Sequence, residues 1–314
     1  MTPHSTAKGP ERQDAGFRTL LGRRLPVIGR PAPGESPAGR PARRRTGRPL
    51  PRAGRYLLGA ALVAVPLALA VAGPWLAGEA GPRGVSYAAS GPGHWLGTDF
   101  TGRDVWRQLL LGGRSVVLVA LAATALVYAL ALPVGLTAAL TGRRWAEELL
   151  MRPLDVLLAV PSLILVLLVA AALEPGPAGL ALLVALVAVP DAARVVHAAA
   201  LEVAARPVVE AMRMHRESWL RIALGHTVRE LRRTLAADAG TRLVGSLYLV
   251  STAAFLGVGV APDAADWAVM VDRNRPGIDL QPWAVVLPAA LIAALAMGTN
   301  LLLDAALHGR DGRR

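Results

Sequence analysis

The sequence contains no cysteine, which excludes disulfide bonds, thiolate metal sites and a cysteine nucleophile. Lysine is almost absent too, since Lys8 is the only one and Gly9 and Pro10 follow it. A phosphate-binding P-loop needs a lysine followed by serine or threonine, because the lysine neutralises the terminal phosphates. We therefore predict that the chain is not an enzyme and does not hydrolyse ATP by that route.

Aromatic residues are scarce as well, at 4% of the 314 residues, although 54% of the residues are hydrophobic and the mean hydropathy is +0.43. The apolar residues are therefore mostly aliphatic. An ordinary soluble domain is about 45–50% apolar and rarely contains several apolar runs of about twenty residues. The composition indicates an all-α, polytopic integral membrane protein.

Six hydrophobic segments are each close to the roughly 20 residues that cross a hydrocarbon layer of about 30 Å as a helix. They cover approximately residues 57–76, 116–140, 154–173, 179–196, 239–258 and 283–307. Asp191 and Arg194 lie near the end of the fourth segment, three residues apart on one helix face, and we predict that they pair. We find no ionisable residue deep within a segment, which argues against a proton-coupled carrier.

The distribution of arginine indicates the orientation of the chain. Residues 1–55 are rich in Arg, Pro and Gly and have few apolar residues, so we expect a disordered, basic cytoplasmic arm. Arginines also gather at 141–153, at about 197–237 and in the tail at 309–314. We therefore place these segments and both termini in the cytoplasm. The net charge of +12 follows this topology, so we expect membrane lipid, and no nucleic acid, as a partner.

A loop on the opposite side contains His94, Asp99 and Asp104, spaced five residues apart. This spacing matches no standard pattern of metal ligands, so we predict no metal site. We predict instead a folded, hydrogen-bonded loop in which Gly97 and Gly102 are turn residues.

The segment EAMRMHRESWLRIALGH, at 210–226, is far more polar than the sequence on either side of it. Its apolar residues include Met212, Trp219, Leu220 and Ala223, and its arginines are Arg213, Arg216 and Arg221. An apolar face with arginines around it is typical of a helix that docks into a groove of a partner protein. An amphipathic helix that lies on lipid headgroups is the alternative.

Four stretches occur in a fixed order relative to the six segments. They are HWLGTDFTGRD from residue 94, LMRPLDVLLAVPSLIL from 150, the polar segment with its flanks at 190–226, and AFLGVGVAPDAADWAVM from 254. Together they resemble the inner-membrane permease subunit of ABC importers of the dipeptide, oligopeptide and nickel class. The resemblance covers approximately residues 55–308.

The resemblance implies a type-I (MetI-like) ABC importer permease architecture, with six transmembrane helices over residues 56–308 in the cytoplasmic (inner) cell membrane. Such a chain forms half of a translocation pathway for peptides or similar small solutes. The implied partners are two cytoplasmic ABC ATPase subunits, a second homologous permease and an extracytoplasmic solute-binding protein. ATP and Mg would be bound by the ATPases, and this chain would hold no cofactor.

The resemblance also implies the roles of particular residues. The family carries an E-A-A-x-x-x-G motif in the loop that contacts the ATPase, and the residues at 210–212 match its start. The implied ATPase-coupling residues are Glu210, Ala211, Met212, Arg213, Trp219, Leu220 and Arg221. The implied outer-loop motif residues are His94, Gly97, Thr98, Asp99, Gly102, Arg103 and Asp104.

The chain departs from the family pattern at four positions. Arg216, Ala268 and Leu303 replace glycines, and Arg229 replaces a proline. A non-glycine residue forced to positive φ at 216 would cost roughly 1–2 kcal/mol. Without the proline, we expect the helix to run on past Arg229. The departures leave open a divergent paralogue that acts as a non-transporting membrane scaffold, and a stand-alone secondary carrier is the other alternative.

Overall fold

The computed structural model describes residues 52–308. The described chain is helical and contains no β-strand, only isolated bridges in the loop before α2. Residues 52–55, which the prediction placed in the basic arm, form the first turn of α1. The rest of the predicted arm and the predicted tail at 309–314 lie outside the described residues.

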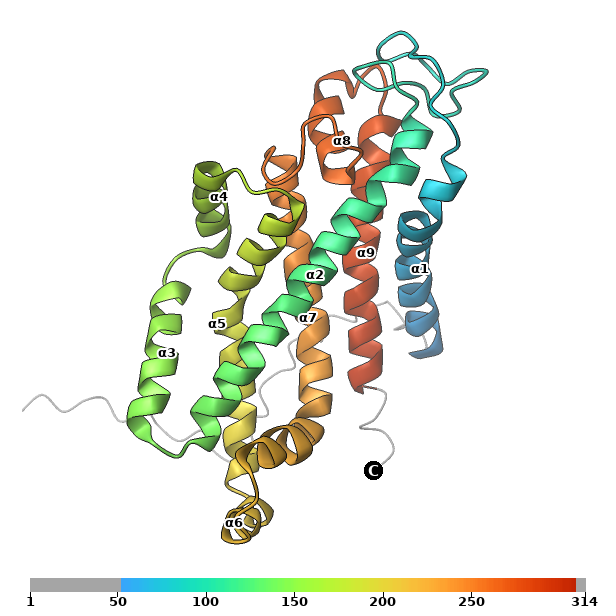
Figure 1. Ribbon diagram of the computed structural model, residues 1–314. Helices are drawn as coiled ribbons and strands as arrows, with labels where there is room; N and C mark the ends of the chain where they lie inside the picture. The colour runs from blue at the N-terminus through green and yellow to red at the C-terminus, as the bar shows by residue number, and fades with distance from the viewer. Residues whose placement is uncertain (1–51, 309–314) are drawn as a thin grey trace, which may run out of the picture. The chain divides into compact units, whose positions relative to one another are not determined.

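Long helices run side by side and form the body of the molecule (Figure 1). They are α1 (Arg52–Leu76), α2 (Val105–Leu140), α5 (Pro177–Ala204), α7 (Val228–Phe255) and α9 (Trp283–His308). Among the residues described, α1, α2, α5 and α9 are long and apolar enough to cross a membrane, which gives four candidate spans. The fifth predicted segment lies in α7, which is long enough but too polar to be counted by composition.

The third predicted segment is broken rather than continuous. It forms α3 (Arg144–Leu158) and α4 (Ser162–Leu173), which are bent by 86° relative to each other. Pro161 explains the break, because it has no backbone N–H for a helical hydrogen bond and disfavours helical geometry at Val160. If the bent pair is one span, the described chain has up to five candidate spans.

Three helices extend beyond the apolar segments that predicted them. α2 begins at Val105, well before residue 116, because Asp104 caps its first turn by accepting a hydrogen bond from the Trp106 N–H at 3.1 Å. α5 continues to Ala204 and α7 begins at Val228. Hydropathy identifies only the apolar part of a helix, so it does not predict polar turns at the helix ends.

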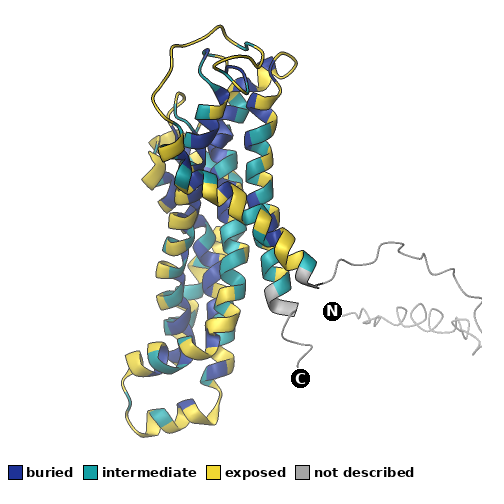
Figure 2. Ribbon diagram, turned by 90° about the vertical axis from the view of Figure 1, so that its right-hand side faces the viewer, coloured by how far each residue is buried: buried dark blue, intermediate teal, exposed yellow. Residues whose placement is uncertain are grey.

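Small residues allow the central helices to approach closely. Ala131 of α2 packs with Ala185 and Ala192 of α5 in a cluster of fully buried residues. A Cβ atom on Gly135 of α2 would lie 2.7 Å from Val196 Cγ1, so only glycine fits at this contact. Such small-residue contacts are how helices pack in membranes. Figure 2 shows the buried residues along the inner faces and the exposed residues outside.

The two ends of the bundle carry different structures (Figure 1). At one end lie the loop before α2, the short helix α8 (Trp267–Asn274) and the 3-10 turn at Arg275–Gly277. At the other end lie α6 (Pro207–Met214) and the π-helix at Arg221–Thr227, which joins α7 without interruption.

Candidate functional site

The candidate site is the surface formed by α6, the turn after it and the π-helix, residues 207–227, which we call the docking surface. An apolar cluster fixes it to the bundle: Val209 and Ile222 are buried together with Leu136 of α2 and Val203 of α5. Leu231 of α7 belongs to the same cluster. The docking surface is therefore attached to three long helices.

The outward side of the docking surface is apolar. Met214 is 74% exposed, Leu220 61% and Trp219 41%. Val208 and Leu224 are also exposed, and the sequence analysis did not select them or Met214. Large apolar side chains exposed together at one place are a mark of an interaction site.

Two residues of the predicted apolar face lie elsewhere. Ala223 is fully buried, and the half-buried Met212 packs against the buried cluster that fixes the docking surface. The prediction of an outward face that includes these two residues is therefore wrong. The connection between α6 and the π-helix rotates the two helical pieces relative to each other, so their residues cannot be read as one continuous helix.

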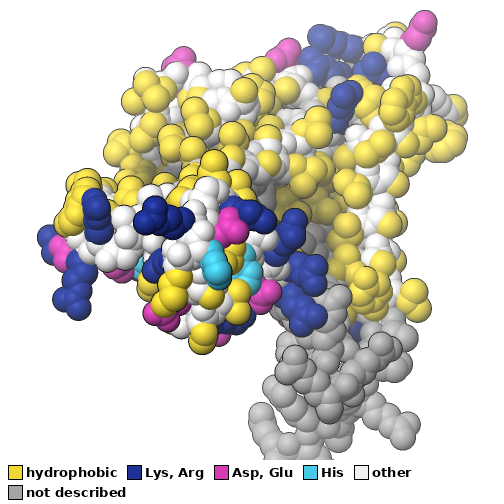
Figure 3. All heavy atoms as spheres, turned by 60° about the horizontal axis from the view of Figure 1, so that its bottom comes forward, with side chains coloured by type: hydrophobic (Ala, Val, Ile, Leu, Met, Phe, Trp, Pro, Cys, Tyr) yellow, Lys and Arg dark blue, Asp and Glu magenta, His cyan; other side chains and the backbone are white. Residues whose placement is uncertain are grey.

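Charged residues surround the apolar side chains (Figure 3). Glu210 and Ala211 are exposed, and the Glu210 side chain makes no hydrogen bond or ion pair with any residue that the structure describes. Arg213 donates from Nη2 to the Leu140 carbonyl at 3.0 Å. Arg221 pairs with Glu217 at 3.0 Å. Glu210 is thus the carboxylate that this surface leaves available to a partner.

The turn after α6 contains a strained residue. Arg216 has φ of 55°, and its N–H donates to the Arg213 carbonyl at 3.0 Å. The next N–H, from Glu217, donates to the Met212 carbonyl at 3.1 Å. These two bonds are those of a Schellman motif, in which the residue with positive φ is usually glycine. Arg216 thus adopts the positive φ that the family's glycine would allow, and it carries the cost of that conformation.

The predicted continuous helix past residue 229 is confirmed. The π-helix passes into α7 at Val228, and both Thr227 and Val228 have right-handed helical geometry. The Thr227 hydroxyl donates to the Ile222 carbonyl, five residues earlier, at 3.0 Å. Arg229 keeps a backbone N–H that a proline would lack, so the helix needs no break here.

The outer-loop motif residues form the hydrogen-bonded loop that the sequence predicts. Asp99 Oδ1 accepts hydrogen bonds from the Thr101 N–H, the Thr101 hydroxyl and the Arg103 N–H, each at 2.8 Å. Gly97 and Gly102 have φ of 72° and 76°, as turn residues with positive φ do.

The remaining motif residues join this loop to its surroundings. Thr98 accepts from the Ala88 N–H at 2.8 Å and donates to the Val85 carbonyl at 2.5 Å. Arg103 donates to the Asp263 carbonyl at 2.9 Å. His94 is half-buried, and its Nδ1 has no hydrogen-bond partner among residues 52–308. Within that range no three His, Asp or Glu residues lie where they could hold a metal ion.

α8 packs against α2 and also contacts the outer loop, where the Phe100 N–H donates to Asn274 Oδ1 at 3.0 Å. Trp267 is fully buried and donates from Nε1 to the Leu109 carbonyl at 2.8 Å. A Cβ atom on Gly113 of α2 would overlap the Trp267 ring. Asp266 caps α8 by accepting from the Ala268 and Val269 N–H groups at 2.8 and 3.3 Å. Burial raises the pKa of the Asp266 carboxyl, and these hydrogen bonds offset part of the rise.

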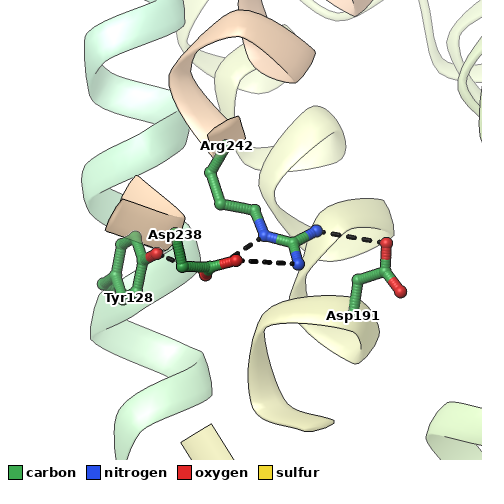
Figure 4. Close-up of polar contacts among 4 residues, drawn as sticks. All are labelled: Tyr128, Asp191, Asp238 and Arg242. Carbon is green, nitrogen blue, oxygen red and sulfur yellow. Dashed lines mark hydrogen bonds and ion pairs between the residues drawn. The ribbon is translucent and has the colours of Figure 1, made fainter. Parts of the chain in front are cut away.

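A network of charged residues crosses the middle of the bundle (Figure 4). Arg242 of α7 contacts both carboxylate oxygens of Asp238, at 3.3 and 3.2 Å, and donates to Asp191 of α5 at 3.1 Å. The Tyr128 hydroxyl of α2 donates to Asp238 at 2.5 Å. The predicted pair of Asp191 with Arg194 is wrong, because Arg194 forms its ion pair with Asp155 of α3.

The depth of these residues also corrects the sequence analysis. Asp191 lies in the candidate span Pro177–Ala204 and Tyr128 in the span Val105–Leu140, well inside both helices. The described bundle therefore does contain ionisable residues within its spans. Tyr128 was missed because the sequence gives no sign of which helix faces it.

The chain was compared with known proteins. A family model described as "Binding-protein-dependent transport system inner membrane component" matches residues 131–308. The probable D,D-dipeptide transport system permease protein of Escherichia coli is 29% identical over 249 residues, which cover 78% of this chain and 83% of that protein. A putative peptide transport system permease protein of Brucella suis is 30% identical over 262 residues, 82% of this chain and 88% of that protein.

Proposed function

This chain belongs to the family of binding-protein-dependent transport system inner membrane components, the permeases of ABC importers, and we propose that it forms half of a translocation pathway for peptides. The observation that carries the proposal is the docking surface, where exposed apolar residues and a free carboxylate are fixed to the bundle. The names of its relatives, which are dipeptide and peptide permeases, support a peptide as the solute.

We propose that the membrane domain has six spans in a type-I importer architecture. α3 and α4 together are one span, and α7 is another. The two charges in the middle of α7 are compensated within the bundle, since Arg242 and Asp238 pair with each other and their side chains are only 15% and 12% exposed. Paired and hydrogen-bonded charges are tolerated inside a membrane bundle.

The docking surface would couple the permease to a cytoplasmic ATPase. Trp219 and Leu220 would enter a groove of the ATPase, and Glu210 would pair with a basic residue of the groove rim. Because the apolar cluster ties the surface to α2, α5 and α7, movement of the ATPases would shift these helices as a body. ATP and Mg would bind to the ATPases, and this chain would need no cofactor of its own.

The partners and the orientation follow from the same proposal. Two ATPases would sit on the cytoplasmic side, a second homologous permease would complete the pathway, and a solute-binding protein would meet the outer loop. Both termini would be cytoplasmic, because the arginine-rich connections at 141–153 and 205–227 lie at the end of the bundle that carries the docking surface.

Co-purification tests the proposal. The tagged chain is extracted from its native membrane in mild detergent, and its partners are identified and assayed for ATP hydrolysis. We expect an ATPase and a second permease in the complex. Recovery of the chain alone, also after crosslinking, would leave the scaffold as the better account.

A stand-alone carrier is the second candidate, because the Asp191–Arg242 network places ionisable groups inside the spans. Reconstitution in liposomes separates the two functions. A carrier would take up solute along a proton or sodium gradient with no ATPase present, whereas the importer requires the ATPases and ATP.

A further inference from the structure

A cavity of about 390 Å³ opens beside the charged network. Its lining comes from the α3–α4 break, α5 and α7, and includes Val160, Ser162, Asp191, Thr241, Arg242 and Tyr248. The volume falls within the roughly 300–1,000 Å³ of small-molecule sites in proteins. The side chains that line the cavity include both charged groups and hydroxyl groups.

The helix break indicates that this cavity contains water. In a bilayer, backbone that is not helical is found only where it is buried in protein or lines a water-filled cavity. Val160 and Pro161, at the break, both line this cavity, and Val160 is exposed. Interrupted helices also form the solute sites of several other classes of membrane transporter.

The charged network beside the cavity carries an unbalanced charge. Asp191 and Asp238 are two carboxylates, and Arg242 is the one guanidinium that they share, so the formal charge of the three is −1. Arg242 and Asp238 are largely buried, whereas the Asp191 side chain is 60% exposed. Only Oδ2 of Asp191 receives a hydrogen bond from a described residue. Asp191 therefore presents a free carboxylate oxygen toward a water-filled cavity.

We propose that this cavity is a solute-binding site of the translocation pathway, in which Asp191 accepts the free amino terminus of a peptide. An ammonium group balances the excess negative charge and donates up to three hydrogen bonds. Tyr128 holds Asp238, Asp238 holds Arg242, and Arg242 in turn positions Asp191 (Figure 4). The inference rests on the proposed function, since it assigns a solute site to a peptide permease.

Uptake by the complete importer in proteoliposomes tests the charge requirement. The probes are alanyl-alanine and N-acetyl-alanyl-alanine, supplied with the same binding protein, and the readout is the ratio of their kcat/KM values. The kcat/KM for alanyl-alanine is divided by that for N-acetyl-alanyl-alanine, and the result for a variant is compared with the result for the wild type, so the selectivity of the binding protein cancels. In Asp191→Asn we expect the preference for alanyl-alanine to be about tenfold lower than in the wild type, as for the loss of a charge-assisted hydrogen bond.

Asp155→Asn is the matched control. Asp155 also pairs with an arginine and is about half exposed, but it does not line the cavity, so its variant should keep the wild-type ratio. An unchanged ratio in Asp191→Asn, or an equal fall in both variants, would overturn the inference. Loss of the second permease from the complex in Asp191→Asn would also overturn it, because Asp191 would then serve the contact between permeases. Absence of ATP-driven uptake in the wild type would instead overturn the proposed function.

Cysteine protection tests occupancy of the cavity directly, because the chain has no cysteine of its own. Thr241→Cys places a thiol in the cavity wall, and Thr252→Cys places one on the same helix in a different groove. In the complete importer, alanyl-alanine should slow the reaction of a maleimide with Thr241→Cys and not with Thr252→Cys. N-acetyl-alanyl-alanine should protect less. Equal rates with and without alanyl-alanine at Thr241→Cys would overturn the inference.

Discussion

The outer loop and the docking surface are both assembled from residues of the family motifs, yet they use their side chains differently. At the end of the bundle that carries the outer loop, Trp267 of α8 is fully buried and hydrogen-bonded, and Asp99 accepts three hydrogen bonds from its own loop. On the docking surface Trp219 is exposed, and the Glu210 carboxylate has no partner among the described residues. Residues that are satisfied within the chain serve the fold, whereas residues left unsatisfied are available to another protein.

The backbone does not separate the two regions in the same way. The outer loop places glycine at two tight positions, Gly97 and Gly102, where a positive φ costs little, but it also holds Tyr87 at φ of 56°. The docking surface holds Arg216 at φ of 55°, in a turn whose hydrogen bonds are complete. Each region therefore contains one non-glycine residue at positive φ, and the difference between the regions lies in their side chains.

The two tryptophans give the largest contrast. Trp267→Ala should lower the free energy of unfolding by about 3–5 kcal/mol, because it leaves a cavity against Gly113 and removes the bond to Leu109. Trp219→Ala should lower it by about 1 kcal/mol or less, because the ring is exposed. Denaturant unfolding in mixed micelles measures both. Equal losses would mean that Trp219 is part of the core and would break the comparison.

Reversing the free carboxylate should affect docking and leave the fold intact. We expect Glu210→Arg to abolish uptake while the protein remains in the membrane, since reversing an interface charge weakens docking by about 2–5 kcal/mol. Glu202→Arg, on the exposed end of α5, is the control and should retain uptake. Solute uptake and membrane content are measured in the same cells. Uptake near the wild-type level in Glu210→Arg would remove the docking role.

Relieving the strained turn should have a smaller effect. Arg216→Gly removes the roughly 1–2 kcal/mol cost of positive φ. Glycine loses more conformational entropy on folding, which costs about 0.5–1 kcal/mol, so the stability of the turn should rise by about 1 kcal/mol or less. Slower hydrogen exchange of the amides at 216–222 measures the gain. Arg213→Gly, one turn earlier in α6, should speed exchange because it loses the bond to Leu140. Faster exchange in Arg216→Gly would show that the arginine side chain itself stabilises the turn.

The smallest expected effect concerns Asp266 and depends on pH. Burial raises the pKa of Asp266 above its ordinary value of 3.8, so the folded state holds the proton more tightly than the unfolded state. Stability is then lost as the pH rises through the folded-state pKa. Asp266→Asn keeps a capping oxygen but carries no charge. At neutral pH its free energy of unfolding should exceed that of the wild type by about 1 kcal/mol or less, and near pH 4 the two should be equal. A constant difference across pH would contradict the burial argument.

The sequence predicted those features that depend on local pattern. Apolar runs located the long helices, and the glycines and Asp99 indicated the folded outer loop. The family motif placed a glycine at 216, which indicated where a positive φ would be costly, but only the structure shows that Arg216 adopts it.

Features that depend on contacts between helices were not predictable. The spacing of Asp191 and Arg194 suggested a pair within one helix, but each finds its partner on a neighbouring helix. Met212 and Ala223 were placed outward because periodicity gives a helix an apolar face without saying what covers it. Pro161 was visible in the sequence, but the 86° size of the bend was not.

Site-specific crosslinking at the docking surface tests the central claim most directly. Because the chain has no cysteine, Leu220→Cys can carry a single thiol-linked photo-crosslinker in native membranes, and Trp95→Cys, which is also exposed and lies in the outer loop, is the control. We predict that residue 220 crosslinks to an ABC ATPase and that residue 95 does not. Crosslinks from residue 220 to lipid alone would contradict the account and would mean that this surface lies on the membrane.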